Sequence, residues 1–210
     1  MAPKSTGAAI DPIQTALKHH QAGRLAQAEA IYRDVLRTKP DHADALHLLG
    51  VIALQGGRHE IAVDLIGKAI KVNPSVPDFY SNCGDAWRAM ERLNEAVACY
   101  EKALQLKPDF PLVRNNLGNA LKDQGKIPEA IACYQKAIQL KPDFHEAYNG
   151  LGNALKDQGH SGEAIACYEK AIRLKPDFFQ AYNNLGNTWL DQGKQLKPLW
   201  HCPPGSGQTR

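Results

Sequence analysis

The chain has 210 residues, of which 43% are hydrophobic and 22% are charged, and its net charge is +3. No apolar run approaches the roughly 18 to 20 residues that a membrane-spanning helix needs, so we expect no membrane partner. Charges this evenly balanced do not provide the basic stripe that nucleic acids bind, so we expect no nucleic-acid partner. The opening MAPKSTGAAI has no apolar segment typical of a secretory signal, which favours a cytoplasmic location.

A constant interval of 34 residues organises most of the chain. It separates five prolines, namely Pro40, Pro74, Pro108, Pro142 and Pro176. A spacing this regular indicates a tandem array of structural units. We expect residues 1–10 to be disordered, residues 11–194 to form five full repeats plus the first helix of a sixth, and residues 195–210 to be a disordered tail rich in proline and glycine.

The residue pattern of each repeat predicts two helices. In residues 148–178, Tyr148, Leu151 and Leu155 follow helical spacing along one stripe, and Gly159 ends that first helix. A second stripe around Tyr168 continues until Pro176, and Asp177 is the expected cap of the next first helix.

Individual repeats depart from the common pattern along the chain. The first helix of the first repeat is unusually polar, as suits the end of an array. In the third repeat Glu91 replaces the glycine of the turn, and in the fourth Arg114 occupies an aromatic position. The sixth begins normally with Tyr182 and Leu185, but the body of its second helix is missing. The open side of that last helix is a candidate surface for self-association.

Glycine recurs inside every first helix from the second repeat onward, at Gly50, Gly84, Gly118, Gly152 and Gly186. Each costs about 1 kcal/mol relative to alanine in a helix, so an opposing contribution is required. We expect close approach of the paired helix, with small residues such as Ala130 and Ala164, to provide it.

The combined pattern of an aromatic residue, Leu-Gly, alanine, an aromatic residue, alanine and proline resembles the tetratricopeptide repeat over about residues 11–194. The resemblance implies an all-α fold, a right-handed α-solenoid of helix-turn-helix repeats whose first helices line a concave groove. We number the positions of each repeat from the third residue after the preceding proline, so that the third repeat starts at Pro77.

Positions two, five, six, nine and thirteen of each first helix point away from its core stripe and toward the expected groove. From the third repeat onward, asparagine dominates this face, and the adjacent position twelve carries Lys122 and Lys156. Asparagine is a weak helix former, and its amide can pair with both N–H and C=O of an extended peptide. The alternative is an ordinary solvated face. The predicted peptide-binding residues are Asn82, Asn115, Asn116, Asn119, Lys122, Asn149, Asn153, Lys156, Asn183, Asn184 and Asn187.

The runs NNLGNALKDQGK and EAIACYQKAIQLKPDF are similar to the repeats of O-linked N-acetylglucosamine transferases, and the opening repeats resemble bacterial members of that group. The resemblance implies a ladder of position-six asparagines that holds substrate polypeptide. The matching residues are Asn82, Asn116 and Asn184, and Gly150 interrupts the ladder. In those enzymes a catalytic domain follows the repeats, and we expect none here because the chain stops at Arg210.

Two classes of function therefore remain. The first is a scaffold whose groove binds a protein or an extended peptide, with Asp123, Asp157 and Asp191 among the charges that adjust its preference. The second is the substrate-recruiting part of a glycosyltransferase that lacks its catalytic domain. We expect no catalysis by this chain, no cofactor and no metal, because the histidines are scattered and no Cys/His spacing is typical of zinc sites.

Overall fold

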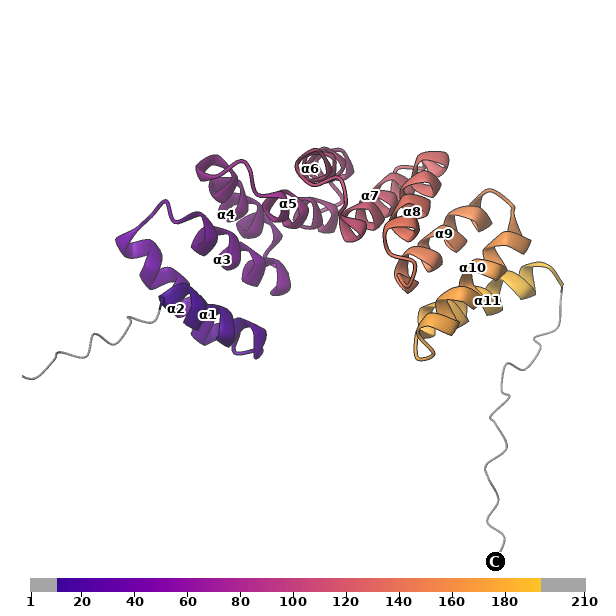
Figure 1. Cartoon of the computed structure of the whole chain (residues 1–210), viewed down its shortest axis with the longest axis horizontal. Helices are drawn as coiled ribbons and strands as arrows, with labels where there is room; N and C mark the ends of the chain where they lie inside the picture. The colour runs from indigo at the N-terminus through magenta and orange to yellow at the C-terminus, as the bar shows by residue number, and fades with distance from the viewer. Residues whose placement is uncertain (1–10, 194–210) are drawn as a thin grey trace, which may run out of the picture.

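The computed structural model describes residues 11–193, and these residues form eleven α-helices and no strand (Figure 1). The expected disorder of residues 1–10 and 195–210, and the last residue of the expected array, lie outside this range. The helices are α1 Pro12–Gln21, α2 Leu25–Thr38, α3 Ala43–Gln55, α4 His59–Val72, α5 Pro77–Ala89, α6 Leu93–Leu106, α7 Pro111–Asp123, α8 Ile127–Leu140, α9 His145–Asp157, α10 Ser161–Leu174 and α11 Phe179–Asp191.

The helices stack in chain order into an arch (Figure 1). Each first helix packs against the second helix of its own repeat, and each second helix packs against the first helix of the next repeat. From α3 onward, consecutive odd-numbered helices also contact each other, whereas the even-numbered helices of the described range make no comparable contacts with one another. The odd-numbered helices therefore lie on the inner, concave side. The predicted fold class, an all-α right-handed solenoid, is confirmed.

The turn inside each repeat requires one residue in the left-handed conformation. Glycine provides it in most repeats, for example at Gly159 with φ 83°. In the third repeat Glu91 adopts the same conformation with φ 59°. Its turn keeps the backbone bond seen elsewhere, since Arg92 N donates to Trp87 O at 3.0 Å just as His160 N donates to Leu155 O at 2.9 Å. For a residue with a side chain, this conformation costs about 1–2 kcal/mol.

The expected cap at Asp177 is wrong. Helix α11 begins after Phe178, which makes no side-chain capping bond. Asp177 instead lies in the preceding turn, where its carbonyl oxygen accepts from Phe179 N at 3.0 Å. A true side-chain cap occurs at the start of α1, where Asp11 Oδ1 accepts from Ile13 N at 3.0 Å.

The glycines of the first helices lie against a large side chain of the paired helix. A Cβ atom added to Gly84, Gly118 or Gly152 would lie 2.6 to 2.8 Å from the tyrosine ring at position twenty-four of the same repeat. The expected close approach is thus confirmed, but the nearest atoms to these three glycines belong to an aromatic ring and not to the expected alanines. These rings, Tyr100, Tyr134 and Tyr168, are fully buried.

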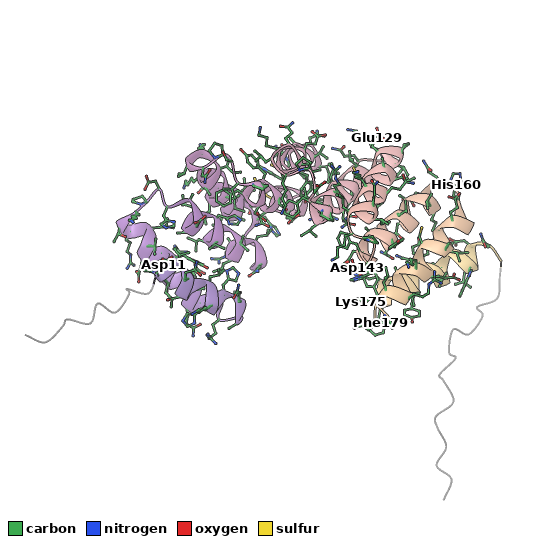
Figure 2. All side chains as sticks on the ribbon, in the orientation of Figure 1. Asp11, Glu129, Asp143, His160, Lys175 and Phe179 are labelled. Carbon is green, nitrogen blue, oxygen red and sulfur yellow. The ribbon has the colours of Figure 1, made fainter. Side chains whose placement is uncertain are left out.

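The last described helix, α11, packs on α10 and α9. Leu185 is fully buried in that contact. On the other side Phe179 and Leu190 are 75% and 58% exposed, and Figure 2 labels Phe179 near the start of the helix. None of the helices in residues 11–193 has the length and apolar character required to cross a bilayer.

We predict that Gly118→Ala lowers stability by about 1–3 kcal/mol, because the new methyl group would lie 2.8 Å from the Tyr134 ring and force the packed helices apart. The control is Gly67→Ala in α4, where no atom lies within 4 Å of the new Cβ. There the better helix propensity of alanine should raise stability by up to about 1 kcal/mol. Urea midpoints followed by circular dichroism measure both changes, and a stabilised Gly118→Ala variant would contradict the packing argument.

Candidate functional site

The eleven residues predicted to bind peptide lie on α5, α7, α9 and α11, which form the inner side of the arch. Their exposure differs. Asn115 is buried, with 6% of its surface exposed. On α11, Asn183 and Asn187 are exposed, whereas Asn184 is half-buried. The inner face is therefore a partly packed polar surface, and most of its side chains also contact other parts of the protein.

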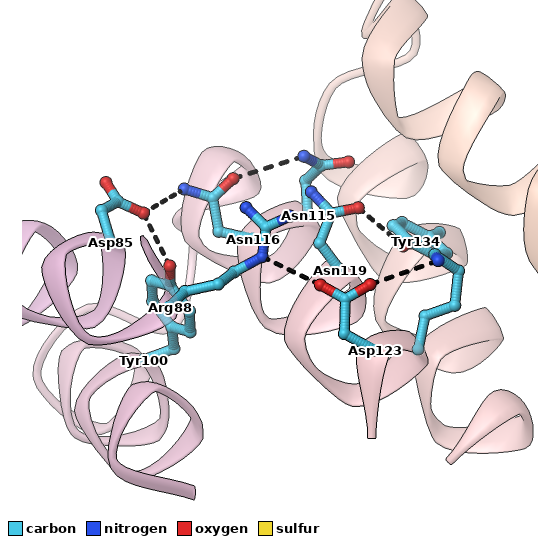
Figure 3. A network of polar contacts seen from close by, with 9 residues as sticks. Asp85, Arg88, Tyr100, Asn115, Asn116, Asn119, Asp123 and Tyr134 are labelled. Atoms are coloured by element: carbon cyan, nitrogen blue, oxygen red, sulfur yellow. Dashed lines mark hydrogen bonds and ion pairs between the residues drawn. The ribbon is translucent and has the colours of Figure 1, made fainter. Parts of the chain in front are cut away.

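Position nine of the first helix receives a hydrogen bond from the tyrosine at position twenty-four. Tyr100 Oη donates to Asp85 Oδ1 at 2.6 Å, and Tyr134 Oη donates to Asn119 Oδ1 at 2.7 Å (Figure 3). Tyr168 Oη donates to Asn153 Oδ1 at 2.9 Å. The oxygen atoms of Asn119 and Asn153 are thereby directed into the repeat, and their amino groups take no part in these bonds.

The sequence contains a signal for the bond between positions nine and twenty-four. An oxygen-bearing residue stands 15 residues before each of these three tyrosines. In the second repeat both positions are aliphatic, with Val51 before Ile66. In the first repeat Leu17 precedes Tyr32, and the buried Tyr32 hydroxyl has no hydrogen-bond partner in the described part of the chain. The helical stripes predicted these tyrosines only as core residues, and their hydrogen bond to position nine was missed.

Position-six asparagines connect consecutive repeats. Asn82 Nδ2 donates to His47 Nε2 at 2.8 Å, and Asn184 Nδ2 donates to Asn149 Oδ1 at 2.9 Å. Both bonds run from position six to position five of the preceding repeat, a separation of 35 residues. Asn116 Nδ2 donates to Asp85 Oδ1 at 2.9 Å (Figure 3). The three residues assigned to a peptide ladder therefore also hold neighbouring inner helices together.

Charged and polar side chains form a second set of links near the ends of the inner helices. They join position twelve to position thirteen of the next repeat. Arg88 Nε lies 3.2 Å from Asp123 Oδ2, and Lys156 Nζ lies 2.7 Å from Asp191 Oδ2. Lys122 instead pairs with Asp123 of its own repeat at 3.3 Å. These pairs are partly exposed, so each contributes about 0–1 kcal/mol.

Two ionisable groups with shifted pKa values belong to this network, the buried His47 and the half-buried Asp85. Burial lowers the pKa of His47 to about 4, against the weaker opposing influence of Asp78 and Asp44. The imidazole is therefore neutral near pH 7, as it must be for Nε2 to accept from Asn82. Burial raises the pKa of Asp85, and hydrogen bonds from Tyr100 and Asn116 partly oppose that shift.

A hollow of about 700 Å³ opens between the ends of α5 and α7. Its lining includes the carboxylates of Asp85, Glu91 and Asp123 together with the guanidinium of Arg88. These side chains can form hydrogen bonds and ion pairs with a bound group. Within residues 11–193, no three His, Cys, Asp or Glu side chains are grouped closely enough to hold a metal ion.

We predict that Tyr134→Phe lowers the free energy of unfolding by about 1 kcal/mol, because Asn119 loses a buried hydrogen bond while the ring contact is kept. Tyr32→Phe is the matched control. Its hydroxyl is buried without a partner in the described residues, so its removal should leave stability unchanged or slightly higher. Thermal unfolding of both variants compares them directly, and equal losses would show that the hydroxyl bond is unimportant.

We predict a histidine-dependent loss of stability in acid. Folding depresses the pKa of His47, so its contribution is complete above the unfolded value of 6.5 and is lost as the pH falls toward 4. Between pH 7.5 and 5 this loss amounts to roughly 2 kcal/mol. The His47→Gln variant cannot take up a proton there and should lose correspondingly less stability over the same interval. Urea titrations of both proteins at the two pH values test this, and parallel losses would exclude His47 as the source.

A family model described as TPR repeat matches residues 84–125, 118–159 and 152–193. A second model, described as Tetratricopeptide repeat, matches residues 14–71. The first model alone spans residues 84–193, which is more than half of the chain.

Solved structures of similar fold include MamA, with 24% identity and a TM-score of 0.70 over 77% of this chain and 94% of that one. YrrB, described as a TPR protein with an unusual peptide-binding site, has 22% identity and a TM-score of 0.68 over 83% and 90% of the two chains. TTC0263, a thermophilic TPR protein in Thermus thermophilus, has 20% identity and a TM-score of 0.70 over 85% and 97%. With most of the array matched by its models and the same solenoid in its structure, the chain belongs to the tetratricopeptide-repeat family.

Proposed function

We propose that this chain is a protein-interaction scaffold that binds an extended segment of a partner protein on its concave face. The observation that carries the proposal is the fixed orientation of the position-nine amides. Tyr134 and Tyr168 occupy the oxygens of Asn119 and Asn153, and both asparagines are half-buried on the inner side of the arch. Their amino groups are thus preorganised donors, which lowers the entropic cost of binding.

Main-chain carbonyl groups are the natural partners of such donors. An extended segment exposes a carbonyl at every residue, whatever its sequence, and two positioned amino groups in consecutive repeats can bind two of them. Asn183 and Asn187 on α11 extend the polar surface. YrrB, which has the same fold, is described as having an unusual peptide-binding site, so a chain of this fold can bind a peptide.

Side-chain preference would come from the charges of the same face. Asp85, Glu91 and Asp123 outnumber Arg88 around the hollow between α5 and α7. A lysine or arginine of the partner therefore fits the hollow better than an acidic residue does. Lys122 and Lys156, already paired with aspartates, modify this preference along the arch.

The test removes the donors and keeps the fold. Asn119→Asp with Asn153→Asp retains an oxygen for each tyrosine, as Asp85 does naturally for Tyr100, but eliminates both amino groups. The probe is a fluorescein-labelled peptide selected from a random 15-residue library on the full chain. We predict that its dissociation constant, measured by fluorescence anisotropy, rises tenfold or more, as expected for the loss of two net hydrogen bonds of about 1 kcal/mol each.

The matched control adds the same charge on the outer helices. Asn94→Asp with Gln139→Glu keeps the acceptors used by Gln124 and Lys136 and should change affinity less than twofold. Failure to select any peptide, or equal affinities for the two double variants, would contradict the proposal.

An alternative proposal is the substrate-recruiting region of an O-linked N-acetylglucosamine transferase-like enzyme. Its support is the similarity of NNLGNALKDQGK and EAIACYQKAIQLKPDF to the repeats of those enzymes. A glycosyltransferase domain in the reading frame downstream of residue 210 would favour this alternative, and a stop codon with no such neighbour would favour the free scaffold. The peptide-binding test applies to both.

A further inference from the structure

The third repeat carries two cysteines that face each other across its paired helices. Cys83 on α5 and Cys99 on α6 occupy positions seven and twenty-three, and both belong to one hydrophobic cluster. The fourth and fifth repeats place leucine at position seven, opposite Cys133 and Cys167. Among the repeats in residues 11–193, the third alone brings two thiols to this contact.

The paired helices approach each other closely in this register. The two cysteines come directly before the glycine and the tyrosine whose contact was described above. In the second repeat, a Cβ added to Gly50, next to position seven, would lie 3.3 Å from the Cβ of Leu65 at position twenty-three. The two Cβ atoms of a disulfide are about 3.5–4.5 Å apart. Backbones paired in this register therefore approach each other as closely as a disulfide requires.

The two thiols are in contact in the folded chain. Cys83 and Cys99 are free cysteines, and their sulfur atoms are hydrogen-bonded to each other. The indole of Trp87, one helical turn after Cys83, is a second hydrogen-bond partner of the Cys83 sulfur. Core packing alone does not require a thiol at position seven, since leucine fills it in the neighbouring repeats.

The two thiols differ in their access to solvent. Cys83 is buried, with 5% of its surface exposed, whereas Cys99 is half-buried. A small oxidant therefore reaches Cys99 first. The hydrogen bond with Cys83, and burial after it, raise the pKa of Cys99. Because the thiolate is the reactive form, oxidation should be slow near pH 7 and faster at higher pH.

We propose that Cys83 and Cys99 form a site of reversible oxidative modification, at which hydrogen peroxide joins the two helices of the third repeat by a disulfide. The Cys99 thiolate attacks one peroxide oxygen, the O–O bond breaks, and hydroxide leaves and takes up a proton to become water. The sulfur of Cys83 then attacks the Cys99 sulfenic acid, so that the S–S bond forms, the S–O bond breaks and a second water leaves with the Cys83 proton. Two thiols are oxidised, and one peroxide is reduced to two waters.

The disulfide would fix the geometry of the third repeat. It closes a short loop around the turn that contains Glu91 and prevents α5 and α6 from separating when the array unfolds locally. It lies beside Tyr100, whose hydroxyl donates to Asp85 on the inner face. The inference is independent of peptide binding, because the bond forms within the chain.

The experiment treats the folded full-length chain with hydrogen peroxide and maps its disulfides. Every protein tested carries Cys202→Ser, because that cysteine lies outside the described residues. After iodoacetamide has blocked the remaining thiols, tryptic digestion without reductant should release residues 72–88 linked to residues 93–102. We expect this linked pair to form faster at pH 8.5 than at pH 7 and to disappear with dithiothreitol. Its formation should raise the thermal unfolding midpoint by roughly 5–10 °C.

Three variants provide the controls. Cys83→Leu introduces the residue of the fourth and fifth repeats and should abolish both the linked pair and the rise in midpoint. Cys99→Leu, which copies Leu65 of the second repeat, makes the same test from the other helix. Cys133→Leu is the matched control, because it removes a cysteine from position twenty-three of a repeat that has leucine at position seven, and it should change neither result.

Three outcomes would overturn the proposal. The first is complete alkylation of Cys83 and Cys99 after peroxide treatment at both pH values. The second is a linked pair that forms only in urea, which would show that the folded helices hold the two sulfur atoms apart. The third is oxidation of Cys99 to the sulfinic acid in the folded chain without any linked pair.

Discussion

In the third, fourth and fifth repeats, the contact between a glycine of the first helix and a tyrosine ring of its paired helix is the constraint on which most of this structure depends. Glycine is a poor helix former, costing about 1 kcal/mol relative to alanine. It is nevertheless required at Gly84, Gly118 and Gly152, because a tyrosine ring occupies the space of the missing Cβ. Burial of the ring offsets the glycine cost, since a large side chain contributes about 1.5–3 kcal/mol when it is fully buried.

The same contact shapes the concave surface. A tyrosine this close to the first helix can extend its hydroxyl past the glycine to the next residue, position nine, and bind an oxygen there. Core packing within a repeat thus determines which end of the Asn119 and Asn153 amides is left for a partner. The links made by Asn82, Asn116 and Asn184 then connect the repeats along the inner side. Packing, inter-repeat contacts and the proposed binding surface use one set of side chains.

Where a residue in the second repeat departs from the repeat pattern, its contact partner changes with it. The second repeat replaces both members of the tyrosine and position-nine pair by aliphatic residues, Ile66 and Val51. At two places in the described chain the matching change is absent. Tyr32 keeps its hydroxyl without a partner in the terminal repeat, and Asn115 keeps an unpaired oxygen opposite Gly150. The first lies in the terminal repeat, whereas the second lies on an inner helix near the middle of the array.

The sequence by itself determined the repeat length, the two helices of each repeat and the inner location of the asparagines, because 34-residue spacing and helical periodicity are properties of the chain alone. Only the tertiary structure decided what the amides bind. Whether Asn116 donates to Asp85 or to position five depends on how two helices are packed across 31 residues of sequence, and no local pattern records that distance. The burial of Asn115 and the shifted pKa of His47 likewise arise from neighbouring repeats, since desolvation is the sum of all atoms around a group and not a property of its place in the sequence.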